Sequence, residues 1–270
     1  MELSDNNYYA DTTYLSNSTI QSYKMCSAKA EALRKGEWKQ SGFNINFAMG
    51  HAFESMLQGD FESRYADTEE AKALLFNKNG SDNAKLKSVR DMVKMCTRSK
   101  LFKIATTGEY EPIFTGEIHG VLFKCKVDVL NLEKGFFTDI KTTKDLEPSW
   151  NKEHRTFMPF YENWNYWRQL AIYQELIFQN TGKRLQPFIA VSSKQKPHYF
   201  DVLEVAQYDD GSFQERLEHE IEELETDIEL INGIRTGAIE PTRCNSSSCE
   251  YCAETYDVTT PTVMIDYLDI

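Results

Sequence analysis

The chain has 270 residues and a formal net charge of −12, with 41% hydrophobic and 27% charged residues. This composition predicts a globular protein with one sizeable core, and its acidity counts against a protein that coats DNA non-specifically, since such binding needs clustered Lys and Arg. The polar amino terminus does not resemble a signal peptide, and no stretch reaches the ~18 apolar residues of a membrane span, so we expect a soluble, cytoplasmic protein.

Helical patterns dominate the first hundred residues. Apolar residues recur there at the spacing of an amphipathic helix, and Gly36 is a typical helix stop. Ser81 or Asp82 can cap the last helix of this part. Four helices are predicted, at residues 18–35, 46–58, 68–77 and 81–98.

Strand patterns follow. Three runs alternate apolar and other residues or are rich in β-forming types, at Glu109 to Ile118, Val121 to Leu132 and Phe136 to Thr143. Glycines stand at or near the joints between them. We therefore predict an antiparallel meander over this part of the chain.

The last third returns to helices with two strands between them. A helix is predicted at 160–180, strands at 186–193 and 198–205, and a long charged helix at 209–234, capped by Asp209 or Asp210. This order predicts a mixed α/β fold, with a mostly antiparallel or mixed central sheet flanked by helices. We expect a single domain over residues 1–270, with a mainly helical part (1–100), a core (105–235) and a cysteine-bearing tail (236–270).

Two acids and a lysine share the predicted meander. Asp128 lies in the second strand-like run, and Asp139 and Lys141 lie two apart in the third, so the latter two point to the same face. Two carboxylates hold Mg²⁺ or Mn²⁺ through hard oxygen ligands, and the carbonyl of Ile140 can add another. The pattern indicates phosphodiester hydrolysis, in which Lys141 assists the attacking water. An ordinary Asp–Lys ion pair on a solvated strand face stays open.

Further residues extend this pattern in chain order. His51 stands on a predicted helix in Gly50-His51-Ala52-Phe53-Glu54, and Gln169 and Tyr173 share one face of a later helix. With Asp128 and the triplet Asp139-Ile140-Lys141, they resemble the PD-(D/E)XK nuclease superfamily, in its RecB-like branch. The chain resembles in particular the phage and prophage RecE-type exonucleases, with Asp139 in the place often held by Glu.

The resemblance implies a restriction-endonuclease-like core and a role for each matching residue. His51 would be a metal ligand that reaches in from its helix to join Asp128 and Asp139. Gln169 and Tyr173 would position the DNA strand or the catalytic acids. By itself a histidine on a helix is usually structural, and a Gln–Tyr pair is as typical of a polar edge beside a core stripe as of a functional site. Glu111 matches an acid on the first strand of the fold, in competition with Glu109 and with a solvated edge.

Three of the six cysteines, Cys244, Cys249 and Cys252, lie within nine residues. Such clustering favours a metal site in a reducing compartment, and Zn²⁺ or a [4Fe–4S] cluster needs a fourth ligand. The layout resembles AddB-type nucleases, which implies Cys26 as that ligand and a [4Fe–4S] cluster that joins the two ends of the domain. The C-x4-C-x2-C spacing departs from that family's C-x2-C-x5-C, so Zn²⁺ and free or disulfide-bonded thiols stay open.

The resemblance implies a metal-dependent exonuclease acting on the ends of linear duplex DNA, in phage-type recombination or repair. Its implied partners are DNA, a single-strand annealing protein and further copies of the chain. Two alternatives stay open, a non-catalytic DNA-repair or interaction module with a cysteine-bound metal, and a single-strand or structure-specific endonuclease. Trp164, Tyr166 and Trp167 can stack on unpaired bases, although the helix core is the more usual place for such residues.

Overall fold

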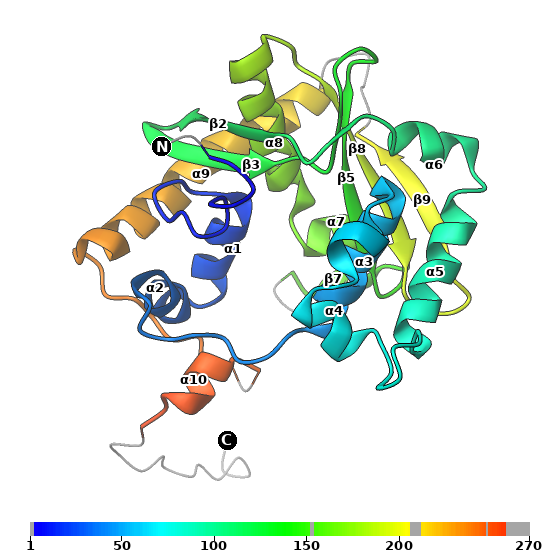
Figure 1. Cartoon of the computed structure of the whole chain (residues 1–270). Coiled ribbons are helices and arrows are strands. Elements are labelled where there is room, and N and C mark those ends of the chain that lie inside the picture. The colour runs from blue at the N-terminus through cyan, green and yellow to red at the C-terminus, as the bar shows by residue number, and fades with distance from the viewer. Residues whose placement is uncertain (1–2, 152–153, 206–211, 247, 258–270) are drawn as a thin grey trace, which may run out of the picture. The chain divides into compact units, whose positions relative to one another are not determined.

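The structure, a computed structural model, describes residues 3–151, 154–205, 212–246 and 248–257 (Figure 1). The chain forms two compact units. Unit 1 comprises Met1–Asn17 and Gly42–Glu229, and unit 2 comprises Ser18–Ser41 and Leu230–Ile270. The sequence predicted a single domain over residues 1–270, and this stays a prediction. No helix in the described part of the chain is long and apolar enough to cross a membrane.

Unit 1 is built on a five-stranded sheet. Its strand order is β1-β4-β5-β8-β9, with β5 and β8 parallel and the other neighbouring pairs antiparallel. The mixed α/β class predicted from the sequence is therefore confirmed. The five strands are β1 (Glu109–Tyr110), β4 (Val129–Asn131), β5 (Phe136–Thr143), β8 (Gln186–Ser193) and β9 (Phe200–Glu204).

The hairpin that precedes β5 is bent where continuous strands were predicted. Its outer half, β2 (Ile113–Ile118) with β3 (Val121–Lys126), forms a separate two-stranded sheet, while β1 and β4 join the main sheet. The bend falls at Glu111, whose φ is 58°, and at Pro112, which has no N–H to donate. Asp128 consequently lies in the bend between β3 and β4, and the prediction that it lies inside a strand is wrong.

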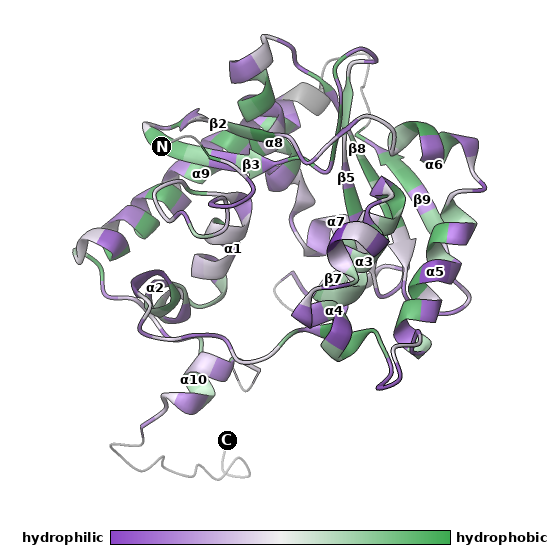
Figure 2. Ribbon diagram, in the orientation of Figure 1, coloured by the Kyte–Doolittle hydropathy of each residue, from purple (hydrophilic) through white to green (hydrophobic). Residues whose placement is uncertain are grey.

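Helices cover the sheet over an apolar core. Phe53 of α3, Met92 of α5 and Phe102 of α6 pack in one cluster with Ile140 and Ala190 of the sheet. Figure 2 shows purple and green alternating along α5, the pattern of a half-buried helix. The side chain of Asn83 caps α5, so the prediction of Ser81 or Asp82 as the cap is wrong. These helices and the π-helical turn beside them are α3 (Ile45–Gln58), η1 (Phe61–Tyr65), α4 (Glu69–Leu74), α5 (Ala84–Cys96) and α6 (Lys100–Ala105).

The helix predicted at 160–180 is divided in two. Asn165 adopts a φ of 49°, which ends α7 (Phe160–Asn163), and its side chain caps α8 (Tyr166–Thr181). The helix α8 packs against β2 and β3. A small hairpin that the sequence did not predict, β6 (Ser149–Asn151) with β7 (Thr156–Met158), precedes α7.

Unit 2 contains α1 (Asn17–Met25), α2 (Ser27–Lys35), the end of α9 (Ser212–Thr236) and α10 (Glu250–Glu254). The single helix predicted at 18–35 is interrupted at Cys26, whose φ of −164° and ψ of 96° are extended. The predicted caps of the long helix, Asp209 and Asp210, lie outside the described residues.

Candidate active site

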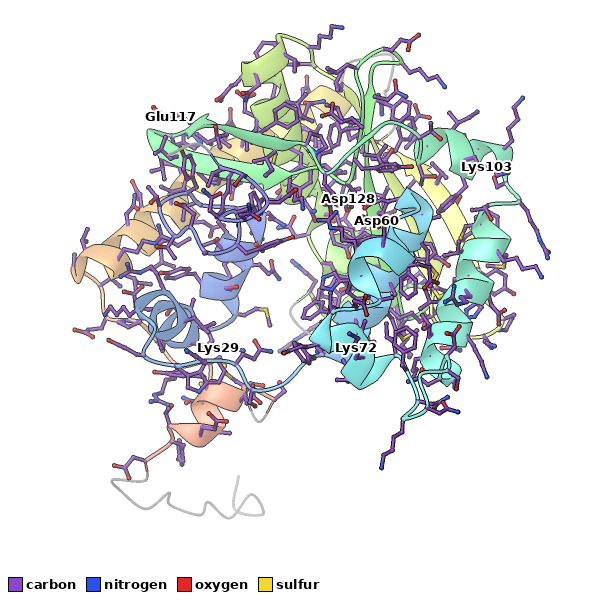
Figure 3. All side chains as sticks on the ribbon, viewed as in Figure 1. Lys29, Asp60, Lys72, Lys103, Glu117 and Asp128 are labelled. Atoms are coloured by element: carbon purple, nitrogen blue, oxygen red, sulfur yellow. The ribbon has the colours of Figure 1, made fainter. Side chains whose placement is uncertain are left out.

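Asp128, Asp139 and Lys141 meet beside the point where β4 and β5 begin to pair. Val129 lies opposite Thr138, so the preceding Asp128 comes next to the following Asp139. The Nζ of Lys141 is 2.6 Å from Oδ2 of Asp139. Figure 3 labels Asp128 close to α3 and β5. The two acids and the lysine singled out in the sequence therefore share one site.

The main chain of Ile140 holds Asp128 in place. Its N–H donates a 2.6 Å hydrogen bond to Oδ2 of Asp128, and its side chain is buried in the core. The N–H and the C=O of one strand residue face the same edge of the strand. The carbonyl of Ile140 therefore faces the edge that carries Asp128, as a metal-ligand role requires, and that role stays a prediction.

Glu54 is a third acid at this site, and the sequence reasoning missed it. Burial raises the pKa of Glu54 well above its usual value, and the negative charges of Asp128 and Asp139 raise it further. Glu54 lies on α3, three residues after His51. In the sequence, Glu54 directly follows the apolar residues Ala52 and Phe53, which the structure buries completely, and this position could have indicated a buried acid.

His51 points to a different partner from the one expected. Its Nδ1 is 2.8 Å from a carboxylate oxygen of Glu70, which also accepts a 2.7 Å hydrogen bond from the hydroxyl of Tyr65. About half of the His51 side chain is exposed. Within the described residues, neither His51 nor Glu54 forms a close metal-ligating group with Asp128 and Asp139. The role of His51 as a ligand stays a prediction that would need the ring to leave Glu70.

Gln169 and Tyr173 lie at the site through one hydrogen-bond chain. The Nε2 of Gln169 donates to Oδ1 of Asp139 at 2.7 Å and to the hydroxyl of Tyr173 at 3.0 Å. Burial raises the pKa of Tyr173 well above its usual value, and the negative charges of Asp139 and Asp128 add to this effect. The hydroxyl of Tyr173 therefore stays protonated.

The charges at the site do not balance. Burial and then the charge of Asp139 raise the pKa of Asp128 to about 7. Burial alone would lower the pKa of Lys141, yet the carboxylates of Asp139 and Asp128 raise it above its usual value. One ammonium thus faces three acids. The raised pKa values mean that these buried carboxyl groups resist carrying their charges together, and a divalent cation such as Mg²⁺ or Mn²⁺, which prefers hard oxygen donors, would offset those charges.

Glu111, the acid matched loosely to the first strand, is held in ion pairs. Its carboxylate is 2.7 Å from Nζ of Lys126 and 2.8 Å from Nη1 of Arg64. Together with its positive φ, these contacts give Glu111 a structural place at the hairpin bend. Lys126 also pairs with Asp5 at 3.0 Å and Arg64 with Asp60 at 3.3 Å, so both cations are engaged by carboxylates.

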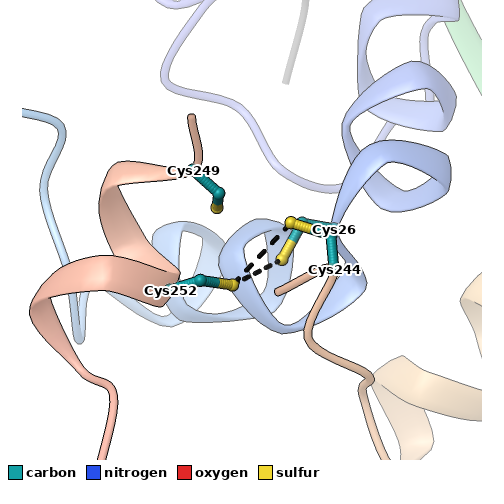
Figure 4. Close-up of side chains that lie close together, drawn as sticks. All are labelled: Cys26, Cys244, Cys249 and Cys252. Carbon is teal, nitrogen blue, oxygen red and sulfur yellow. Dashed lines mark hydrogen bonds between the residues drawn. The ribbon is translucent and has the colours of Figure 1, made fainter. Parts of the chain in front are cut away.

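The four cysteines form a second centre, within unit 2. Cys26 precedes α2, and Cys249 and Cys252 belong to the start and the body of α10 (Figure 4). The Sγ of Cys252 is 3.7 Å from that of Cys26 and 3.8 Å from that of Cys244. All four Sγ atoms lie within 4.8 Å of one another. Cys26, expected to be the fourth ligand, is therefore placed with the other three.

Comparisons with known proteins agree with this fold. The family model described as "PDDEXK-like domain of unknown function (DUF3799)" matches residues 16–255. The crystal structure of a protein of Eubacterium rectale, described as a "Putative exonuclease", is similar to this chain with a TM-score of 0.84 and 25% sequence identity, over 97% of each chain. No curated protein matches.

Proposed function

This chain belongs to the PDDEXK-like family of the PD-(D/E)XK nuclease superfamily, and we propose that it is a metal-dependent deoxyribonuclease that degrades linear duplex DNA from its ends. The observation that carries the proposal is the buried contact of Asp139 with both Lys141 and Gln169, beside Asp128. The exonuclease mode is supported by the RecE-type resemblance and by the description of the Eubacterium rectale protein.

The acids of the site would hold the catalytic ion. We assign Asp128 and Asp139 as ligands, with the carbonyl of Ile140 beside them and Glu54 in the place that the sequence suggested for His51. When bound there, Mg²⁺ or Mn²⁺ would supply positive charge to the scissile phosphate and lower the pKa of the attacking water.

Lys141 has the geometry of an electrostatic catalyst. Its ammonium lies between Oδ2 of Asp139, at 2.6 Å, and the ring of Tyr166, whose centroid is 5.3 Å from Nζ. Because its pKa is raised, Lys141 stays charged and does not act as a base at neutral pH. It would donate hydrogen bonds to the attacking water or to a phosphate oxygen, where negative charge develops in the transition state.

Gln169 would act on Asp139 as a positioning residue. Its amide donates to Oδ1 while Lys141 contacts Oδ2, so the carboxylate plane is set from two sides. The hydroxyl of Tyr173 accepts from the same amide and sets its orientation. This chain of contacts would keep Asp139 ready to bind a cation without rearrangement.

The cysteine centre would hold one metal ion in a structural role. Four thiolates around one tetrahedral Zn²⁺, with bonds of about 2.3 Å, stand about 3.8 Å apart. Two of the six separations, 3.7 and 3.8 Å, match this spacing, and all six are within 4.8 Å. In a [4Fe–4S] cluster each cysteine binds its own iron, so the sulfurs stand further apart. The geometry therefore favours Zn²⁺ over the cluster that the AddB-type layout implied. Four thiolates leave no open position for catalysis.

Cleavage of two DNA forms tests the proposed activity. End-labelled linear duplex and closed circular DNA are each incubated with the protein and Mg²⁺ or Mn²⁺. We expect the linear duplex to be degraded and the circle to survive. Cleavage of circles would favour the endonuclease alternative, and no metal-dependent cleavage of either would favour a non-catalytic module. A single-strand annealing partner and a homo-oligomer are proposed from the RecE-type resemblance.

A further inference from the structure

The β6–β7 hairpin presents two aromatic rings to solvent. Trp150 and Phe157 are partners across the strands, with ring centroids 5.4 Å apart at an interplanar angle of 74°. Their exposed fractions are 54% and 67%. Single exposed aromatics are common on protein surfaces, but a packed pair that covers no core marks a surface able to bind.

Asn163 holds this hairpin in place without help from the two rings. Its side-chain oxygen accepts a 2.7 Å hydrogen bond from Asn151, and its Nδ2 donates to the carbonyl and hydroxyl of Ser149 and to the carbonyl of Met158. Both strands are thereby tied to the end of α7. A hairpin of two three-residue strands would be unstable by itself, so these polar contacts, rather than burial of the aromatics, fix its position.

Asn163, which anchors the hairpin, lies close in the chain to the reaction centre. The chain reaches Tyr166, whose ring lies beside Lys141, three residues after Asn163. Three extended residues span at most about 10 Å. Trp164, between the two, is 57% exposed. Bases stacked on the hairpin would therefore lie within a few nucleotides of the bond that is cut.

The chemistry around the rings suits a nucleic-acid strand. Two basic residues, His154 and Arg155, directly precede β7. His154 and Arg155 are described and exposed. Aromatic rings that stack on bases, next to cations that follow the phosphates, are the usual means of binding single strands.

The three aromatic residues that the sequence offered for base stacking, Trp164, Tyr166 and Trp167, differ in their exposure and contacts. The ring of Tyr166 forms a cation–π contact with the ammonium of Lys141. The indole N–H of Trp167 donates to Glu162, and the guanidinium of Arg216 lies over its ring, so that face is occupied. Trp164 alone of the three exposes more than a third of its surface. The free stacking surface thus lies mainly on Trp150 and Phe157.

We propose that Trp150 and Phe157 form a stacking platform for unpaired bases of a DNA strand next to the reaction centre. The proposal rests on the proposed nuclease function. A duplex hides its base faces in its own stack, so a solvent-facing ring pair can meet those faces only where the strands have separated. The occupant is therefore single-stranded DNA, at an opened end or as the product strand.

Binding to two oligomers tests the platform without cleavage. An Asp139→Asn background prevents cleavage, and the dissociation constant is measured by fluorescence anisotropy with an oligothymidylate of about 15 nucleotides. An abasic oligomer of equal length keeps the phosphates and lacks the bases. We expect Trp150→Ala with Phe157→Ala to weaken oligothymidylate binding by about tenfold or more and to leave abasic binding unchanged.

Two further variants make this test specific. Trp150→Phe keeps an aromatic ring and should retain most of the affinity. Tyr256→Ala removes an exposed aromatic of unit 2 and should change nothing. Thermal unfolding of each variant checks that the fold is intact.

Three outcomes would overturn the platform. The first is unchanged oligothymidylate binding by the double variant, and the second is an equal loss of binding to both oligomers. The third is a wild-type dimer that the double variant converts to a monomer while the affinity for DNA stays unchanged. Because the readout is binding, the platform and the nuclease fail separately. Base-dependent binding by a chain that cuts no DNA would refute only the nuclease, and active cleavage with no base dependence would refute only the platform.

Discussion

The side chain of Gln169 donates a 2.7 Å hydrogen bond to Oδ1 of Asp139, although thirty residues separate the two in the chain. The other oxygen of Asp139 contacts Lys141, and only 1% of the residue is exposed. Asp139 is thereby held between an amide and an ammonium, with almost none of its own surface open to solvent. Its orientation depends on α8 as much as on its own strand.

Replacement of Gln169 by Ala should lower the cleavage rate about 10- to 100-fold, the usual effect of losing a partner that orients a metal ligand. The variant leaves Oδ1 of Asp139 without its donor, so the concentration of Mg²⁺ needed for half-maximal rate should rise as well. Gln179→Ala is the matched control, because Gln179 lies on the same helix and bonds Glu117, which Figure 3 labels well away from Asp128. An equal loss in both variants would argue against a positioning role.

Lys141→Ala should reduce the cleavage rate by about 10²- to 10³-fold, because it removes the donor to the charge that develops at the phosphate. Lys144→Ala, three residues further on, is the control, since Lys144 is 86% exposed and pairs weakly with Asp145. The rates are compared on linear duplex DNA under single-turnover conditions. A Lys141→Ala enzyme with normal rate would exclude the assigned site.

Glu54→Gln should cost more activity than His51→Ala. Glu54 lies among the charges of Asp128 and Asp139, whereas His51 is paired with Glu70 at the surface. We expect about a 10- to 100-fold loss for Glu54→Gln, with a higher Mg²⁺ requirement, and a smaller loss for His51→Ala. A titration of rate against Mg²⁺ distinguishes them, and the reverse order would restore His51 as the ligand.

Cys252→Ser should strip the metal from unit 2. Elemental analysis of the wild-type protein should give about one zinc per chain, without the absorbance near 400 nm that an iron–sulfur cluster produces. The variant should lose the zinc and unfold at lower temperature, because a structural ion contributes directly to folding. Cys96→Ala, in the core of unit 1, should keep the metal. Brown protein with iron in place of zinc would contradict the single-ion centre.

Local patterns determined much of this protein. The short strand predicted at 186–193 and the helical spacing along 46–58 matched β8 and α3 closely, because each depends on the local sequence of one element. The period of two along a strand placed Asp139 and Lys141 on one face. The spacing of Gln169 and Tyr173 likewise placed them together, since four residues make about one helical turn.

Contacts between distant segments were decided by the tertiary structure alone. The bend at Glu111 and Pro112 moves Asp128 out of its predicted strand, because the hairpin changes sheets there. The packing of α3 on β5 brings Glu54 to the acids and leaves His51 with Glu70. The sulfurs of Cys26 and Cys252, 226 residues apart, come within 3.7 Å in the same way. Periodicity states which side of an element is buried, and the packing of whole elements selects which residues meet.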